Sequence, residues 1–262
     1  MKGMTTVAVV NQKGGSSKTT TVLGLASAAS ARGIETLVID LDPQCNASEA
    51  LGIEYPMDGL TAADLLANEL RGSAVDAVRP STWDCVSLIP ADLDLADLDA
   101  VSGIGIEQRL RAALDSDDLR ERFPLVVIDC PPSVGKLVSN ALIAADTALV
   151  ATEPSFMASR GVAKILDAID TITRYYNPSL TVAGVLLGRV PAQGRETSHR
   201  AAEIRAALGD LVLPVVVPQR AAVAEATGDH TPIHRVRPIV AEVSQAFDAA
   251  LDRVLAAVAV AS

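Results

Sequence analysis

The chain has few aromatic residues, few cysteines and no long apolar run. Only 3% of its 262 residues are Phe, Trp or Tyr, so a core must consist mostly of Ala, Val, Leu and Ile. The three cysteines, Cys45, Cys85 and Cys130, are odd in number and lack metal-like spacing, which favours small buried residues in a reducing cytosol. No stretch approaches the roughly 20 apolar residues of a membrane-spanning helix. The N-terminal residues MKGMTTVAVVN do not form a secretory signal. We therefore expect a soluble cytoplasmic protein.

Positive charge is also scarce. The chain has 22 Lys and Arg residues against 32 Asp and Glu, a net charge of −10. This excludes a protein that is basic over its whole surface, although a local basic patch remains possible. The length fits one large or two small domains, and no repeat, low-complexity tract or linker divides it. We therefore predict a single domain over residues 1–262.

Short β-branched runs alternate with Ala- and Leu-rich stretches along the chain. The runs are continuously apolar, as in strands of a sheet that is covered on both faces. The predicted strands are 5–10, 35–40, 85–90, 124–129, 147–152, 180–187 and 211–217. The predicted helices are 18–31, 61–70, 104–115, 136–145, 159–175, 197–207 and 239–258. This alternation predicts an α/β fold with a doubly wound, mostly parallel sheet and helices on both faces.

Carboxylates follow two of the predicted strands. The run LVID ends at Asp40 and is followed by Leu41 and Asp42, and the run LVVID ends at Asp129. Ligands of open parallel sheets bind beyond the carboxyl ends of the strands, and the segment NQKGG also follows a strand. All three features therefore point to one rim of the sheet. For Asp40 and Asp42, capping of a helix near 46–51 is the alternative interpretation.

A glycine-containing segment, KGGSSKTT at 13–20, lies between the first predicted strand and the first helix. Glycines let the backbone approach a ligand, and the start of a helix offers unpaired N–H groups that suit phosphate. Lys18 then neutralises phosphate charge and the Thr19 hydroxyl can bind Mg²⁺. The alternative is a plain strand–helix turn capped by a serine. The predicted phosphate-binding residues are Gly14, Gly15, Ser16, Ser17, Lys18, Thr19 and Thr20.

The usual phosphate-loop pattern G-x-x-x-x-G-K-[ST] does not fit, because Gln12 and Ser17 stand at its glycine positions. The segment fits the variant K-G-G-x-x-K-T. With this variant, the chain resembles the deviant Walker A ATPases of the ParA/MinD family, within the P-loop NTPases. It is most similar to the short ParA-type partition ATPases. The resemblance covers nearly the whole chain and includes the motifs NQKGGSSKTTT, LVIDLDPQCNAS, LVVIDCPPS and, more weakly, PQRAAVAEA.

The resemblance implies ATP and Mg²⁺ as cofactors and a homodimer that encloses two ATP molecules. In such a dimer Lys13 reaches across to the nucleotide of the partner subunit. Asp42 then orients the attacking water, Asp129 holds Mg²⁺ through water, and Asp40 supports the metal side. Lys13, Lys18 and Asp42 are thus the expected catalytic residues.

Three further features of the site follow from the same resemblance. CPPS at 130–133 implies a segment that senses the γ-phosphate, with a plain proline turn as the alternative. Pro218 and its neighbours are expected to line the adenine. Asn or Thr is common in the family where this chain has Gly188. Ser17 replaces a common glycine, and a positive φ there would cost a serine about 1 kcal/mol.

The C-terminal part of the chain carries most of the basic character. Residues 184–240 contain seven arginines and five acidic residues, a net charge of +2. By resemblance this region binds DNA without sequence preference and places the ATP-bound protein on the nucleoid. Ordinary solvated arginines are the alternative. The candidate DNA-binding residues are Arg195, Arg200, Arg220, Arg235 and Arg237, with Arg195 first among them.

The resemblance also implies a centromere-binding partner of the ParB type that accelerates a slow ATPase. Two alternatives keep the same fold. MinD-like positioning on a membrane requires a basic amphipathic C-terminal helix, whereas AFDAALDRVLAAVAVAS has only Arg253 as a basic residue. The other alternative is an ATPase that positions a protein cargo. We therefore expect partition of plasmid or chromosomal DNA, without a membrane partner.

Overall fold

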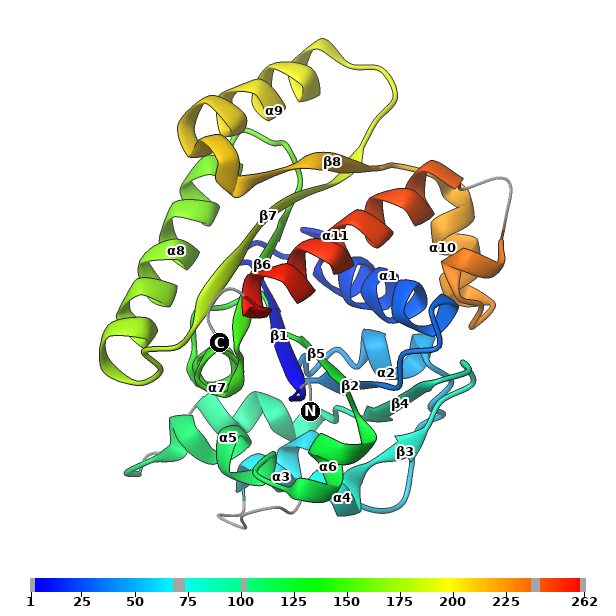
Figure 1. Ribbon diagram of the computed structural model, residues 1–262, viewed down its shortest axis with the longest axis vertical. Helices are drawn as coiled ribbons and strands as arrows, with labels where there is room; N and C mark the ends of the chain where they lie inside the picture. The colour runs from blue at the N-terminus through cyan, green and yellow to red at the C-terminus, as the bar shows by residue number, and fades with distance from the viewer. Residues whose placement is uncertain (1–2, 68–73, 100–102, 237–240, 260–262) are drawn as a thin grey trace.

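The computed structural model describes residues 3–67, 74–99, 103–236 and 241–259. Within them, a single eight-stranded sheet forms the centre of the molecule, in the order β3-β4-β2-β5-β1-β6-β7-β8 (Figure 1). The strands are β1 (Thr5–Val10), β2 (Thr36–Asp40), β3 (Arg79–Pro80), β4 (Val86–Ile89), β5 (Leu125–Asp129), β6 (Thr147–Thr152), β7 (Thr181–Val190) and β8 (Val212–Pro218). All neighbouring pairs are parallel except β3 and β4. The predicted doubly wound, mostly parallel sheet is therefore confirmed.

The predicted strands agree with the structure to within one or two residues at most ends. Continuous burial of both faces explains this agreement, since every residue of β1, β2, β5 and β6 is buried. Two strands differ from the prediction. The β7 strand continues to Val190, and the two-residue β3, which contains Pro80, was not predicted. A proline-containing edge pair of this length leaves no apolar pattern in the sequence.

Helices lie on both faces of the sheet. They are α1 (Lys18–Ala31), α2 (Asn46–Ala50), α3 (Ala62–Ala67), α4 (Ala74–Ala77), α5 (Arg109–Ala113), α6 (Asp117–Arg122), α7 (Lys136–Ala144), α8 (Ala158–Tyr175), α9 (Arg195–Leu208), α10 (Ala221–Gly228) and α11 (Ala241–Ala259). Short 3₁₀ turns are η1 (Leu93–Asp99), η2 (Ile106–Gln108), η3 (Gly209–Leu211) and η4 (Ile233–Arg235).

The helix predicted over 104–115 is wrong in part. Gly105 has a left-handed φ of 79°, so a 3₁₀ turn precedes α5, which begins only at Arg109. The short polar helix α6 and the helix α10 were not predicted. The helices predicted over 61–70 and 239–258 extend into residues outside the described ranges. None of the described helices combines the length and apolar character that crossing a membrane requires.

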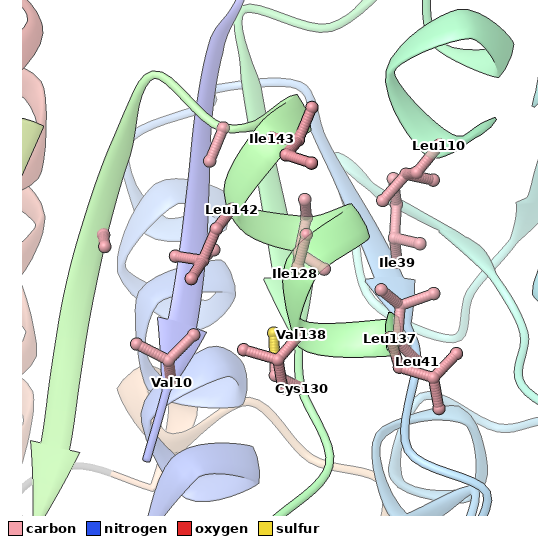
Figure 2. Close-up of a cluster of buried hydrophobic side chains, with 14 of the residues drawn as sticks. Val10, Ile39, Leu41, Leu110, Ile128, Cys130, Leu137, Val138, Leu142 and Ile143 are labelled. Carbon is pink, nitrogen blue, oxygen red and sulfur yellow. The ribbon is translucent and has the colours of Figure 1, made fainter. Parts of the chain in front are cut away.

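The core consists of one apolar cluster on each face of the sheet. On one face, α7 covers β1, β2 and β5, where Leu137 and Val138 lie close to Cys130 and Leu41 (Figure 2). On the other face, α1 and α11 lie side by side (Figure 1). Their close approach requires Gly24, because a Cβ there would lie 2.4 Å from ring atoms of Phe247. The two clusters hold the sheet rigidly, and its carboxyl-end rim carries the candidate site.

Candidate functional site

The phosphate loop joins β1 to α1 and has two residues in the left-handed region. Gly15 and Ser17 both have φ of 69°. Glycine adopts this conformation freely, whereas serine is strained in it by about 1–2 kcal/mol. The α1 helix begins directly after Ser17, at Lys18. Its first turn has N–H groups without intrahelical partners, which is the usual arrangement for binding an anion.

A cavity of about 720 Å³ lies over this loop, a volume typical of small-molecule sites. Its lining contains every residue predicted to bind phosphate, together with Asp42 and Pro218. The opposite wall comes from β8, α10 and the two residues between them, among them Val217, Gln219 and Val223. Segments that lie 200 residues apart in the chain therefore meet at one site, as the common rim predicts.

The two lysines of the loop have different surroundings. Lys18 is only 6% exposed and its Nζ donates to the carbonyl of Lys13 at 3.3 Å. Burial lowers the pKa of the Lys18 ammonium, and the charge of Asp129 opposes this effect. Lys13 is exposed, and its own Nζ donates to the Ser155 hydroxyl at 3.3 Å. Lys18 thus belongs to the cavity of its own subunit, whereas the Lys13 ammonium lies at the surface.

Asp129 is a fully buried carboxylate beside this loop. Within the described residues neither of its oxygens accepts a hydrogen bond of regular geometry, although the Thr19 hydroxyl lies near enough to oppose the rise of its pKa. Burial, and next the charge of Asp40, raise the pKa of Asp129 well above its ordinary value. A buried carboxylate without a partner is costly unless a cation or ordered water compensates it. Asp129 therefore fits a hydrated Mg²⁺ ion, which binds few protein carboxylates and keeps several waters. The Thr19 hydroxyl, also on the lining, supplies a second oxygen.

Asp40 lies beside Asp129 in the β2–β5 register but is fully engaged by hydrogen bonds. Its Oδ1 accepts the N–H of Asp42 at 3.0 Å. Its Oδ2 accepts the Ser48 N–H at 2.9 Å and the Ser48 hydroxyl at 2.7 Å. Burial raises the pKa of Asp40 to about 6, although these bonds to Ser48 and Asp42 lower it. The bonds to Ser48 match the helix-capping interpretation, and the bond to Asp42 fixes the segment that carries the second carboxylate.

Asp42 lines the cavity with little exposure and accepts the N–H of Gln44 at 3.0 Å. Ser16 also lines it, and its buried Oγ lacks a hydrogen-bond partner among the described residues. The Ser16 hydroxyl can donate a hydrogen bond to an oxygen of a bound ligand, and the Asp42 carboxylate can accept one from a water molecule beside that ligand.

Three residues near the cavity were not predicted. The Asn11 side chain donates to the Ala151 carbonyl at 2.6 Å and joins β1 to β6. Arg189 lines the cavity, and Glu153 pairs with it at 3.1 Å. Glu153 directly follows β6, and Arg189 is the last residue but one of β7, so their place at the rim could have been read from the same pattern as Asp129.

The candidate DNA-binding arginines are mostly paired within the subunit. Arg200 contacts Glu196 at 2.7 Å and Glu203 at 2.8 Å. Arg220 pairs with Glu242, and Arg235 pairs with Asp84. Arg237 lies outside the described residues. Arg195, at the start of α9, is exposed and makes no ion pair with any described residue.

Comparisons with known proteins identify the family of this chain. The family model described as an AAA domain (AAA_31) matches residues 4–182. The chromosome partitioning protein ParA of Caulobacter vibrioides is 35% identical over 87% of this chain and 85% of its own length. The sporulation initiation inhibitor protein Soj of Bacillus subtilis is 31% identical over 87% of this chain and 89% of its own.

Solved structures show the same likeness. The cobyrinic acid a,c-diamide synthase of Mycobacterium smegmatis, with bound ADP and magnesium, has a TM-score of 0.78 and 29% identity. The match covers 96% of this chain and 94% of that one. The same family is indicated by the deviant phosphate loop, by the two strand ends that carry carboxylates, and by sequence identity over most of the chain. The chain belongs to the ParA/MinD family of P-loop ATPases.

Proposed function

We propose that this protein is a ParA-like ATPase that dimerises around ATP, binds DNA without sequence preference and partitions DNA with a ParB-type partner. The proposal rests on the different surroundings of Lys13 and Lys18. Lys18 is buried in the cavity of its own subunit, whereas the Lys13 ammonium lies at the surface beside Ser155. An exposed cation outside the lining of its own subunit's cavity is suited to the nucleotide of another subunit.

The chain's own residues account for binding and hydrolysis of ATP. Lys18 and the N–H groups at the start of α1 hold the β- and γ-phosphates. Thr19 and Asp129 hold Mg²⁺, which neutralises phosphate charge when bound. Asp42, fixed by its main-chain bond to Asp40, orients the attacking water. The bound ADP and magnesium of the Mycobacterium smegmatis relative support this assignment.

Lys13 supplies charge to the partner subunit's nucleotide. Charge that develops on the phosphoryl oxygens during hydrolysis is stabilised by a cation supplied in trans, as by an arginine finger. A two-fold dimer makes this exchange reciprocal, so each subunit completes the site of the other. ATP thereby serves as the link that closes the dimer, and its hydrolysis opens it.

DNA is the cargo that the relatives support, since the Caulobacter vibrioides relative is named as a chromosome partitioning protein. Binding without sequence preference requires arginines that neutralise phosphates. Arg195 is the first candidate because it makes no ion pair with any described residue. Arg200, Arg220 and Arg235 must exchange their carboxylate partners for phosphates, so we assign them weaker contributions.

The MinD-like alternative requires a C-terminal amphipathic helix that is available to a membrane. Here α11 packs against the sheet and α1, and it buries Phe247, Leu251 and Val254. Its one arginine, Arg253, donates to the Ala183 carbonyl at 2.8 Å. The described part of this helix therefore belongs to the core, and we favour DNA over a membrane.

DNA binding tests the proposal directly. The affinity for a random-sequence duplex is measured with ATP, ADP and no nucleotide across a salt series, with liposomes in parallel. We expect affinity that requires ATP and falls steeply with salt, and no liposome binding. Arg195→Ala should weaken DNA binding, whereas Arg174→Ala, an exposed arginine paired with Asp170, serves as the matched control. Equal DNA affinity in all three nucleotide states at low salt would overturn the DNA assignment.

A further inference from the structure

Near the carboxyl end of β7, the side chain of Ser17 from the phosphate loop fills the space beside Gly188. Gly188 has no side chain, and a Cβ built there would lie 2.8 Å from both the Cβ and the Oγ of Ser17. Carbon atoms do not approach so closely in folded proteins, and Ser17 is itself buried. Ser17 therefore excludes any side chain at position 188, and β7 cannot contact the ligand through that residue.

Glu153 connects this point to the next residue of the chain. Its Oε1 accepts the Ser17 hydroxyl at 3.4 Å and pairs with Arg189 Nη1 at 3.1 Å. The same carboxylate therefore holds the phosphate loop and the arginine. Arg189 has a left-handed φ of 48°, unusual for a residue with a side chain, and it lines the nucleotide cavity. A strained backbone that an ion pair fixes at a cavity wall suggests that this side chain contacts the ligand.

The sheet order fixes which part of a nucleotide Arg189 would meet. On one side of the phosphate loop, Asp129 ends β5 and Asp42 follows β2, and β7 and β8 lie on the other side. Arg189 immediately precedes Val190, which pairs with Pro218 and accepts the N–H of Gln219 at 2.8 Å. With the phosphates over the loop and Mg²⁺ beside Asp129, the base and ribose fall on the β7–β8 side.

The chemistry of that side suits a purine nucleoside. The described lining there combines apolar Val217 and Pro218 with the donors of Arg189, Arg220 and Gln219, and it includes no carboxylate. Ring nitrogens of a purine and the oxygens of ribose accept hydrogen bonds, and a guanidinium also stacks on aromatic rings. Arg189 is the donor that the ion pair with Glu153 holds in place.

We propose that Arg189, held by Glu153, is a binding residue that contacts the base or ribose of the nucleotide. It lies next to position 188, where Ser17 leaves no space for a side chain. This inference rests on nucleotide binding by the proposed ATPase and goes beyond it, because it assigns recognition of the nucleoside to a named side chain.

The first test separates contacts to the nucleoside from contacts to phosphate. Affinities of wild type, Arg189→Ala and Arg189→Lys are measured with Mg²⁺ for ATP, for ADP and for tripolyphosphate, which has no nucleoside. Since a hydrogen bond to a charged group contributes about 1.5–3 kcal/mol, Arg189→Ala should bind ATP and ADP about 10-fold or more weakly. Its tripolyphosphate affinity should match that of the wild type, and Arg189→Lys should fall between them.

Two outcomes of this test would overturn the proposal. Equal weakening for ATP and tripolyphosphate assigns Arg189 to phosphate, and unchanged ATP affinity removes it from the site. Arg174→Ala is the matched surface control, and a melting curve of each variant separates loss of folding from loss of binding. A wild type that binds ATP but neither dimerises nor binds DNA would refute the proposed function and leave this inference standing.

The second test examines whether the Ser17 side chain excludes a side chain at position 188. Gly188→Ala should weaken ATP binding at least 10-fold because its Cβ collides with Ser17. The double variant Ser17→Gly/Gly188→Ala should recover most of that loss, since removal of the serine side chain frees the space. Normal ATP binding by Gly188→Ala, or a double variant no better than Gly188→Ala alone, would contradict the argument.

Discussion

Replacing Lys13 by alanine should abolish the ATP-dependent dimer and spare the monomer. Among the described residues its Nζ makes one hydrogen bond, at 3.3 Å to the hydroxyl of Ser155. Loss of a surface contact of this kind changes the free energy of unfolding by no more than about 0.5 kcal/mol. The Lys13 carbonyl, which accepts Lys18 Nζ, is retained in the variant. Folding and ATP binding by the single subunit should therefore persist.

The effect on the dimer follows from its two-fold symmetry. Each ammonium that reaches a phosphate across the interface makes charged hydrogen bonds of about 1.5–3 kcal/mol. The substitution removes two such contacts at once, a loss of about 3–6 kcal/mol. The dissociation constant of the ATP-bound dimer should rise by about 10²- to 10⁴-fold.

Sedimentation with a non-hydrolysable ATP analogue measures this change, together with the affinity of each variant for the analogue. Lys164→Ala, which removes an exposed lysine on α8, is the matched control and should dimerise normally. A Lys13→Ala protein that dimerises as tightly as the wild type would refute the trans assignment. So would a Lys13→Ala monomer that no longer binds nucleotide, since Lys13 would then serve its own subunit.

Three further predictions concern hydrolysis, pH and packing. Asp42→Ala should hold ATP in a stable dimer without turnover, and phosphate release by the isolated dimer at wild-type rate would contradict this. Burial raises the pKa of Asp40 to about 6 and that of Asp129 well above its ordinary range. Both carboxyls therefore gain protons as the pH falls, and MgATP binding should weaken below about pH 6. ATP binding measured in EDTA, without Mg²⁺, should not show this weakening at low pH. An equal pH dependence without Mg²⁺ would contradict the assignment of these carboxyls to the magnesium site. Gly24→Ala should lower the melting temperature by a few degrees, because overpacking against Phe247 costs about 1–3 kcal/mol, more than alanine gains in a helix. An unchanged melting temperature would show that the Phe247 ring moves freely.

Elements with a strong apolar pattern could be predicted from the sequence. The buried strands β1 and β5 and the helix α1 begin and end within a residue of their predicted limits. Residues 104–115 were predicted less well because Gly105 turns the chain locally and leaves the apolar pattern intact. Apolar periodicity reports burial, and it does not report a single left-handed residue.

The residues of the candidate site also differ in how well the sequence predicts them. Lys18 and Asp42 follow from motifs that are contiguous in the chain, and the structure brings both to one cavity. The partners of the arginines depend on tertiary packing. Arg235 pairs with Asp84, 151 positions away, and no local pattern could indicate that this arginine is already neutralised.

The phosphate loop is complete by residue 20, but the opposite wall of its cavity comes from residues 217–227, on β8 and α10. On the ribosome, the first part of the site is therefore made long before the last. During most of its synthesis the nascent chain contains Lys18 and the glycines of the loop but not residues 217–227, which line the opposite side of the cavity. The nucleotide cavity is therefore complete only after β8 has joined the sheet, and a truncated product that ends before β8 lacks the wall formed by residues 217–227.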